Sequence, residues 1–351
     1  MKVLHDYSGR IRKLQTLLKN NKLEGIYLSH STSLLYFTGL ELSLGKLLIS
    51  PSKAILFVDS RYREYAENNA SLPIKNLNPT LLQKTLAPWK KLGFEGSDMP
   101  YNEVLELKKM IWKGAKIISV AFSKELRSIK EKSEIECLRL SASLLWKGFL
   151  YLQSQLKRGI TEEQLDSEFR KFCIDHNATL AFDPIIAFGP NGSKPHHKSG
   201  STTLHENTLV LIDIGLNIHS YASDMTRMVF FGDIDPKWKR LYDIVAEAKE
   251  AAMKLCKSGT IIRELDFASR AVFRRENLES HFVHSLGHGV GLDVHERPAI
   301  HKQGDFADLP LQENMVITIE PGLYFPGKGG IRIEDTIQIT KQGYENLFPE
   351  N

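Results

Sequence analysis

The sequence predicts an α+β protein of two domains, in which a smaller α/β domain precedes a larger domain built from a repeated half. The chain has 351 residues, and domains average about 100–200 residues each. Strand-length apolar runs alternate with helix-like segments in the first part of the chain, and two stretches of the second part match each other without a gap. Hydrophobic residues make up 42% and charged residues 25% of the sequence, which is typical of a folded globular protein.

The first domain is predicted to consist of a helix followed by short strands with helices between them. Apolar residues recur at helical spacing in residues 7–21. Apolar runs of strand length, each bounded by turn residues, follow at residues 25–29, 47–50, 54–58 and 92–95. We place the domain boundary just before a long helical segment, which assigns residues 1–125 to the first domain and residues 126–351 to the second.

The second domain is predicted to contain several helices among its strands. The long helix covers residues 129–156, and a capping box from Thr161 to Gln164 starts another helix that reaches Cys173. Two more helices are expected at residues 236–257 and 262–276. The remaining segments alternate apolar strands with glycine-rich turns.

Charge and cysteine usage exclude several classes of protein. There are 46 basic and 42 acidic residues, an excess too small and too evenly spread to favour a nucleic acid or a membrane as partner. No apolar run approaches the roughly 18 residues of a membrane span, and the first residues lack the apolar core of a signal peptide. The three cysteines are far apart and form no C-x-x-C pair, which is typical of free thiols in a reducing compartment. We therefore expect a cytoplasmic protein.

The repeat places acidic residues at corresponding positions. Residues 206–216 (ENTLVLIDIGL) match residues 313–323 (ENMVITIEPGL), and each copy is an apolar strand that ends in a carboxylate, Asp213 or Glu320. Each copy is followed by a second carboxylate on a later strand, Asp224 or Glu334. Any two amphipathic hairpins resemble each other to some degree, but the matched acids favour a duplicated half-domain. Four converging carboxylates would repel one another, and a pair of divalent cations is the simplest compensation.

Histidines cluster in the same half of the chain. Ten of the twelve lie between His176 and His301, and the string from His284 to His295 (HSLGHGVGLDVH) includes His288. Its three glycines argue against a helix, and the glutamate of an H-E-x-x-H zinc motif is missing, so we predict a glycine-rich strand and turn. A lone histidine is more often structural than a ligand, but three in one such string beside paired acids favour a functional site.

Five motifs in order resemble the pita-bread metallopeptidases, the superfamily of methionine aminopeptidase, Xaa-Pro aminopeptidase and prolidase. They are LIDIG at 211–215, SDMTR at 223–227, GHGVGL at 287–292, TIEPGLY at 318–324 and GIRIED at 330–335. The first half resembles, through the weaker motifs LLYFTG at 34–39 and VDSRY at 58–62, the N-terminal domain of Xaa-Pro aminopeptidases, prolidases and creatinase. The resemblance implies a C-terminal pita-bread fold with a pseudo-twofold repeat, preceded by a creatinase-type domain.

The resemblance also implies a dinuclear metal site and roles for its neighbours. The five metal ligands would be Asp213, Asp224, His288, Glu320 and Glu334. Two divalent ions are expected, Mn²⁺ first, with Co²⁺, Zn²⁺ or Fe²⁺ as alternatives, and the attacking group would be a hydroxide that bridges them. Glu320 would also move its proton. His196 and His295 would bind the substrate carbonyl, and His284 would contact the substrate. Arg332 is either a partner that orients the acids or a member of a strand-face salt bridge.

By the same resemblance, the protein would be an Xaa-Pro aminopeptidase that cleaves between an N-terminal residue and a following proline, acting as a homodimer. The proline preference is carried by the resemblance alone. An Xaa-Pro dipeptidase (prolidase) is the nearest alternative. A non-catalytic peptide-binding module on the same fold is more remote, because such relatives typically lack the metal ligands.

Overall fold

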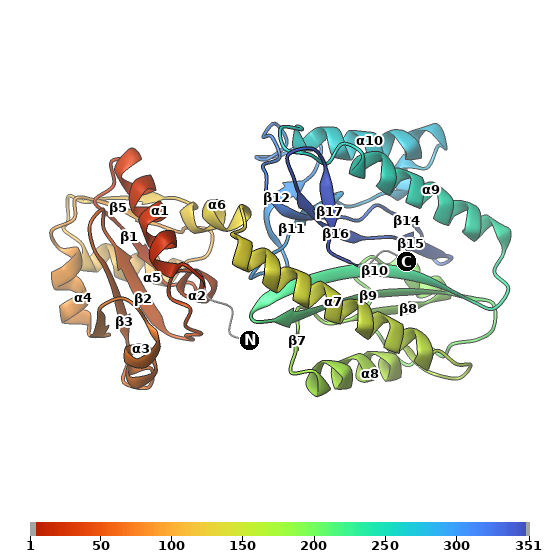
Figure 1. Cartoon of the computed structure of the whole chain (residues 1–351), viewed down its shortest axis with the longest axis horizontal. Helices are drawn as coiled ribbons and strands as arrows, with labels where there is room; N and C mark the ends of the chain where they lie inside the picture. Colours follow the sequence, from red (N-terminus) through yellow and green to blue (C-terminus); the bar gives the residue numbers. More distant parts are fainter. Residues whose placement is uncertain (1–4, 349–351) are drawn as a thin grey trace. The chain divides into compact units, whose positions relative to one another are not determined.

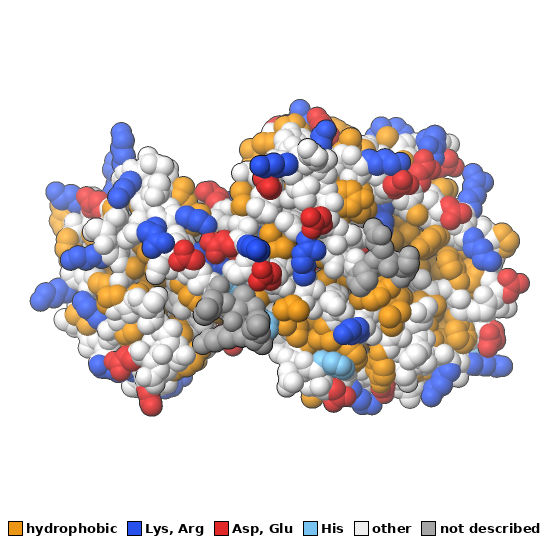
Figure 2. Space-filling model, viewed as in Figure 1, with side chains coloured by type: hydrophobic (Ala, Val, Ile, Leu, Met, Phe, Trp, Pro, Cys, Tyr) orange, Lys and Arg blue, Asp and Glu red, His pale blue; other side chains and the backbone are white. Residues whose placement is uncertain are grey.

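The computed structural model describes residues 5–348, in two compact units that divide between Arg127 and Ser128. Figure 1 shows both units with their helices and strands labelled. We describe each unit by itself. No helix within residues 5–348 is long and apolar enough to cross a membrane. On the face seen in Figure 2, basic and acidic side chains are interspersed over the surface of each unit.

The N-terminal unit is an α/β domain around one six-stranded sheet. Its helices are α1 (Tyr7–Asn20), α2 (Ser31–Thr38), α3 (Arg63–Asn69), α4 (Pro79–Leu86), α5 (Tyr101–Met110) and α6 (Phe122–Ser128). Its strands are β1 (Gly25–Leu28), β2 (Gly45–Ile49), β3 (Ala54–Val58), β4 (Ile74–Asn76), β5 (Lys91–Phe94) and β6 (Lys116–Ser119). The predicted helix and the four predicted strands are all present.

The sheet of this unit has the strand order β4-β3-β2-β1-β5-β6. Strands β1, β2 and β3 pair antiparallel, and the remaining neighbours pair parallel. The apolar runs seen in the sequence are its core, since Tyr27, Leu48, Phe57 and Leu92 pack together with almost no exposed surface. Burial of these side chains is what fixes the sheet.

The C-terminal unit combines four long helices with eleven strands within its described residues. The helices are α7 (Lys132–Gln155), α8 (Glu162–Asp175), α9 (Pro236–Met253) and α10 (Ile262–Arg275), with 3-10 turns η1 (Gly189–Ser193) and η2 (Glu279–His281). The strands are β7 (Thr179–Leu180), β8 (Ile185–Phe188), β9 (Thr208–Ile218), β10 (Tyr221–Phe231), β11 (Gly287–Gly289), β12 (Glu296–Ile300), β13 (Val316–Ile319), β14 (Gly322–Phe325), β15 (Gly329–Arg332), β16 (Asp335–Ile339) and β17 (Tyr344–Asn346). The predicted helices are confirmed with ends shifted by a few residues, and the capping box at Thr161 and Gln164 is formed.

The sheets of this unit lie between two pairs of helices. Strands β10, β9 and β7 pair in that order, with β8 also on β9, and a second sheet runs β12-β11-β13-β16-β17. Helix α7 packs on β9 and β10, and α8 packs on β8, whereas α9 and α10 cover β12 to β15. Figure 1 shows the two helix pairs on opposite sides of the strands. The glycine-rich string forms a strand and a turn, as predicted: β11 covers Gly287–Gly289, and the turn follows it before β12.

The two copies of the sequence repeat form hairpins of different length. In the first copy, β9 and β10 pair over eleven residues through a two-residue turn at His219 and Ser220, both with positive φ. Asp213 therefore lies inside β9, not at its end as the sequence suggested, because β9 continues past it to Ile218. In the second copy, β13 and β16 form the hairpin, and the short pair β14–β15 is inserted between them.

Candidate active site

The first hairpin turns Asp213 and Asp224 toward the same side. Asp224 pairs with Gly215, and Asp213 pairs with Thr226. Side chains alternate along a strand, so residues two apart and their cross-strand partners share a face. Gly215 leaves room between the two acids, and the ring of Phe182 occupies it, because a Cβ at this position would lie 2.3 Å from a ring atom.

The second hairpin supplies Glu320 and Glu334 at the end where its connecting segment leaves β13 and returns to β16. The last pair of β13 and β16 is Ile319 with Asp335, so Glu320 directly follows one strand and Glu334 directly precedes the other. The detour through β14 and β15 returns the chain to this point. Antiparallel pairing thus brings together two acids that are fourteen positions apart in the sequence.

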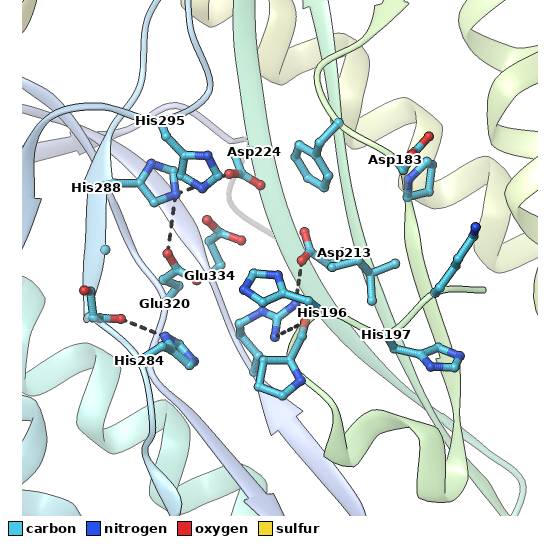
Figure 3. A pocket seen from close by; sticks show the side chains of 18 of the residues that line it. Asp183, His196, His197, Asp213, Asp224, His284, His288, His295, Glu320 and Glu334 are labelled. Carbon is cyan, nitrogen blue, oxygen red and sulfur yellow. Dashed lines mark hydrogen bonds and ion pairs between the residues drawn. The ribbon is translucent and has the colours of Figure 1, made fainter. Parts of the chain in front are cut away.

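All five predicted metal ligands line one cavity of about 810 Å³. Figure 3 shows them facing one another around a common centre. Asp224, His288 and Glu334 each offer an atom within 4.8 Å of the others. The Nε2 of His288 lies 3.5 Å from Asp224 Oδ2 and 3.4 Å from Glu320 Oε1. This cluster brings together acids from both copies of the repeat and the imidazole of His288 on β11.

The tautomer of His288 is fixed by its own strand. Its Nδ1 lies 3.0 Å from the carbonyl oxygen of Gly289, which can only accept, so Nδ1 carries the proton and Nε2 presents a lone pair. Burial and the neighbouring His295 lower the pKa of His288 to about 4, so the ring is neutral at physiological pH. A neutral imidazole with a free Nε2 is the form that binds a metal.

Two carboxylate oxygens in this cluster have no partner within the described residues. They are Asp213 Oδ1 and Glu334 Oε1, both buried. The second oxygen of each acid is held, since Arg332 Nη2 lies 2.5 Å from Asp213 Oδ2 and Thr226 Oγ1 donates to Glu334 Oε2 at 2.8 Å. A buried acceptor without a partner is costly. Oriented acids with one free oxygen each fit a hard divalent cation.

Three acids of the cluster, Asp224, Glu320 and Glu334, hold their protons more tightly than usual. Burial, then repulsion from Glu334, raises the pKa of Asp224 and Glu320 well above its ordinary value. Burial and Asp213 raise the pKa of Glu334 to about 8. The raised pKa values mean that the ionised form of these acids is disfavoured by burial and by mutual repulsion. Divalent cations bound between the acids would relieve this repulsion.

Arg332 organises the far side of the cluster. Besides Asp213, its guanidinium donates to the hydroxyls of Tyr324 (2.7 Å) and Thr226 (3.1 Å). Of the two roles left open for Arg332, this contact with Asp213 fits the partner that orients the acids. Neither Tyr324 nor Thr226 was assigned a role from the sequence. Thr226 could have been found, because it lies two residues after Asp224 on the same strand face.

The other histidines of the prediction surround the same cavity. His196, His284 and His295 all line it, and the ring of His295 lies 4.2 Å from that of His288 between centroids. His197 differs from its neighbour His196, since its Nε2 lies 2.8 Å from the buried Glu162. In Figure 3, His196 points toward the cluster and His197 points away from it.

Comparison with known proteins identifies the class to which this fold and site belong. Residues 136–341 match metallopeptidase family M24, and residues 10–129 match the creatinase/prolidase N-terminal domain. The chain belongs to metallopeptidase family M24, with a creatinase-type domain in front of a pita-bread catalytic domain. It is thus a metal-dependent hydrolase of peptide bonds.

Within this family, the chain is similar along nearly its whole length to proteins of two named activities. An Xaa-Pro dipeptidase of Pyrococcus furiosus is 32% identical over 96% of this chain and 97% of the relative. The prolidase structure from Pyrococcus horikoshii has a TM-score of 0.91 at 32% identity, covering 98% of this chain and 99% of that one. The X-Pro aminopeptidase structure from Thermotoga maritima has a TM-score of 0.88 at 30% identity, covering 97% and 98%.

Proposed function

We propose that this protein is an Xaa-Pro aminopeptidase that removes the N-terminal residue of peptides with proline in second position. Two divalent cations, Mn²⁺ first, would be held by the five cluster residues. The observation that carries this proposal is the convergence of Asp224, His288 and Glu334 with two unpartnered carboxylate oxygens. A homodimer, a cytoplasmic location and the domain boundary at residue 125 stay predictions.

The charges of the cavity favour longer peptides over free dipeptides. A dipeptide ends in a carboxylate close to the scissile bond and needs a nearby cation to bind it. Among the described lysines and arginines of the cavity wall, Arg332 is committed to Asp213, and Arg170 is committed to Asp166 and Asp183. Lys198 lies at the exposed surface. This arrangement supports an aminopeptidase.

The acids of the cluster and the side chains beside them have distinct chemical roles in this proposal. Two divalent cations between the acids would lower the pKa of a water molecule and polarise the scissile carbonyl. Glu320 would take up the proton of this water and return it, because its carboxylate lines the cavity beside the cations. His196 and His295 donate to the carbonyl oxygen, which gains negative charge as the carbon becomes tetrahedral. Arg332 keeps Asp213 in place throughout.

His284 has a narrower role than the other two histidines. Its Nδ1 lies 2.7 Å from the carbonyl oxygen of Ser285, and its Nε2 lies 2.8 Å from the hydroxyl of Tyr324. Both nitrogens are thus engaged within the protein. We assign His284 to the cavity wall that contacts the substrate through the face of its ring.

The Xaa-Pro dipeptidase remains the second candidate. The Pyrococcus relatives, which match this chain over nearly their full length, are named Xaa-Pro dipeptidase and prolidase. A matched set of Xaa-Pro dipeptides and Xaa-Pro-Yaa tripeptides distinguishes the two activities. The protein is stripped with a chelator and then given Mn²⁺ or Co²⁺. Metal-dependent cleavage of the tripeptides with a larger kcat/KM supports the aminopeptidase. Cleavage of dipeptides alone would establish the dipeptidase, and no cleavage of either set would refute a proline peptidase.

A further inference from the structure

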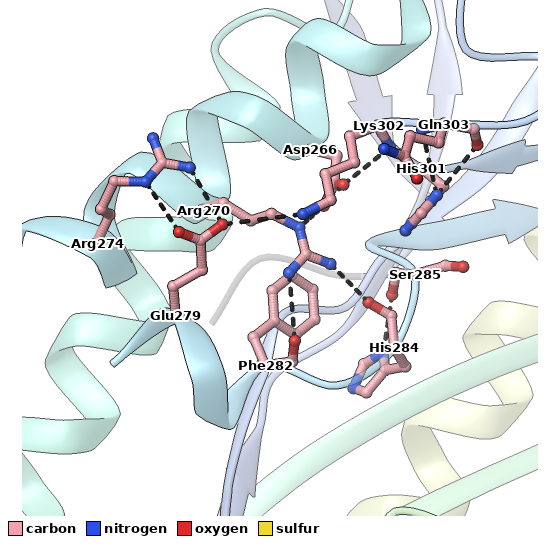
Figure 4. Close-up of polar contacts among 10 residues, drawn as sticks. All are labelled: Asp266, Arg270, Arg274, Glu279, Phe282, His284, Ser285, His301, Lys302 and Gln303. Atoms are coloured by element: carbon pink, nitrogen blue, oxygen red, sulfur yellow. Dashed lines mark hydrogen bonds and ion pairs between the residues drawn. The ribbon is translucent and has the colours of Figure 1, made fainter. Parts of the chain in front are cut away.

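A buried ion pair lies in α10, outside the carboxylate cluster. Asp266 and Arg270 are four residues apart on this helix, and Arg270 Nε lies 2.9 and 3.0 Å from the two oxygens of Asp266. Their side chains are only 0% and 6% exposed. One turn further on, Arg274 forms an ion pair with Glu279, and the side chain of Arg274 is 61% exposed. Figure 4 shows both pairs.

Stability alone does not account for the buried pair. Taking two charges out of water costs more than an apolar contact of the same size, and replacing such pairs by apolar residues is often neutral or stabilising. We therefore ask which hydrogen-bond acceptors the Arg270 guanidinium reaches that an apolar side chain at this position could not bind. The remaining nitrogens of Arg270 identify them.

Arg270 holds the segment that carries His284. Its Nη1 donates to the carbonyl oxygen of Phe282 at 3.2 Å, and its Nη2 donates to that of His284 at 2.9 Å. The guanidinium also lies 4.3 Å from the centre of the Phe282 ring. Residues 282–286 form neither helix nor strand. Asp266 in turn accepts from the backbone N–H of Lys302, which ties a second loop to the pair.

His284 is the first member of a hydrogen-bond chain that ends at the cluster. Its Nδ1–H donates to Ser285, so its Nε2 accepts from the hydroxyl of Tyr324. Tyr324 accepts from Arg332, which is bound to Asp213. Each donor and acceptor in this series of hydrogen bonds is thus assigned without conflict. A shift of the His284 backbone would therefore displace the imidazole ring and alter its hydrogen bond with the hydroxyl of Tyr324.

We propose that Arg270 is a positioning residue that acts through His284. By fixing the backbone carbonyls of residues 282 and 284, the guanidinium holds the imidazole in the cavity wall in its Nδ1–H form. The role of the wall in substrate binding rests on the proposed function, but the control of the ring by Arg270 does not. The ring of Phe282 adds to this control, since it lies edge-on to His284 at 5.0 Å between centroids.

A double-mutant cycle tests the kinetic part. Arg270→Met is expected to lower kcat/KM for an Xaa-Pro-Yaa peptide about 10- to 100-fold, the range that follows from a misplaced wall residue. In a His284→Ala background, Arg270→Met should lower kcat/KM less than about twofold, because the residue through which Arg270 acts is absent. Arg274→Met is the matched control on the same helix and should leave kcat/KM unchanged. Full additivity of Arg270→Met and His284→Ala would overturn the proposal.

Nuclear magnetic resonance of ¹⁵N-histidine protein, loaded with diamagnetic Zn²⁺, tests the positional part without any substrate. The His284 signal, assigned with the His284→Ala variant, should report one Nδ1–H tautomer in the wild type and a mixture in Arg270→Met. Asp266→Leu with Arg270→Met removes both charges and serves if the single variant does not fold. An unchanged His284 signal in the variant would refute the proposal. If the wild type cleaves no proline peptide, the proposed function fails while this result still decides the role of Arg270.

Discussion

The guanidinium of Arg332 lies 2.5 Å from one oxygen of Asp213 and leaves the other oxygen of that carboxylate buried without a described partner. A fixed cation thus neutralises one acid of the cluster and orients it. Within residues 5–348, no lysine or arginine forms an ion pair with Asp224, Glu320 or Glu334, and each of these acids has a raised pKa because it is buried beside other acids. We therefore expect divalent cations to stabilise this site.

Metal binding is expected to stabilise the protein through the cluster. Mn²⁺ at about 100 times its Kd contributes about 2.7 kcal/mol, which corresponds to a rise in Tm of about 5–10 °C. Asp224→Asn should raise the Tm of the metal-free protein, because it removes one repelling charge, and should abolish most of the metal-induced rise. Differential scanning calorimetry with and without Mn²⁺ measures both.

The matched control for this prediction is Asp183→Asn. Asp183 lines the same cavity, but its side chain is 90% exposed and bonded to Arg170. This variant should keep the full metal-induced rise in Tm. An equal loss in both variants, or a full metal response in Asp224→Asn, would contradict the assignment of Asp224 as a ligand.

A second buried ion pair is expected to support the turn that carries His295. Lys130 Nζ lies 3.1 Å from Glu296 Oε2, and the two side chains are 1% and 2% exposed. Lys130→Met should lower the free energy of unfolding by about 3–5 kcal/mol, because it leaves a buried carboxylate without its cation. Lys130→Met with Glu296→Met should recover most of this loss. Urea unfolding of the three proteins measures it, and a double variant as unstable as the single one would refute the explanation.

Burial of His284 is expected to make the protein sensitive to acid. Burial, then the charge of Arg332, lowers the pKa of His284 to about 4, whereas an unfolded histidine titrates near 6.5. As the pH falls from about 6.5 to 4, the unfolded chain takes up a proton that the folded chain refuses, so stability is lost over this range. The contribution of His284 at pH 5 is about 2 kcal/mol.

His284→Gln provides the comparison, because glutamine does not titrate. Urea unfolding of the metal-free proteins at pH 7.5 and 5 should show a larger loss in the wild type than in the variant. Other groups titrate in both proteins and cancel in this difference. Equal losses would show that His284 is protonated in the folded protein near its ordinary pKa.

The cysteines are expected to be unreactive while the protein is folded. Cys137, Cys173 and Cys256 are buried. Burial raises the pKa of the Cys173 thiol to about 11 and that of Cys256 to about 12, so neither forms the thiolate that reacts at pH 8. A thiol reagent such as dithionitrobenzoate should react with none of the three in the native protein and with all three after denaturation. Fast reaction of any thiol in the native protein would contradict this.

Local sequence patterns were sufficient for the helices and strands that were predicted and for the two matched pairs of acids, whereas the choice of His288 as a ligand came from the resemblance to the metallopeptidases. The periodicity of residues 7–21 and the capping box at Thr161 depend on neighbours in the chain, so both could be read directly. Asp213 and Glu320 were found because the repeat places them at equal positions. Both acids were predicted to end a strand, and this was wrong for Asp213. The length of β9 depends on its pairing with β10, which the repeat does not encode.

Contacts between distant segments could not be predicted in the same way. Arg270 lies fourteen residues before His284 and reaches it only through backbone carbonyls, which leave no trace in residue type. Lys130 and Glu296 are 166 positions apart and belong to no motif. The engagement of both ring nitrogens of His284 likewise depends on Tyr324, which the folded sheet brings to it. Long-range packing decides these contacts.

Anomalous diffraction from crystals grown with Mn²⁺ tests the central claim most directly. The account predicts two peaks about 3.5–4 Å apart, enclosed by Asp213, Asp224, His288, Glu320 and Glu334, with Asp213 Oδ1 and Glu334 Oε1 among the ligand atoms. Crystals that hold Mn²⁺ elsewhere, with these five side chains free of metal at saturating concentration, would contradict it.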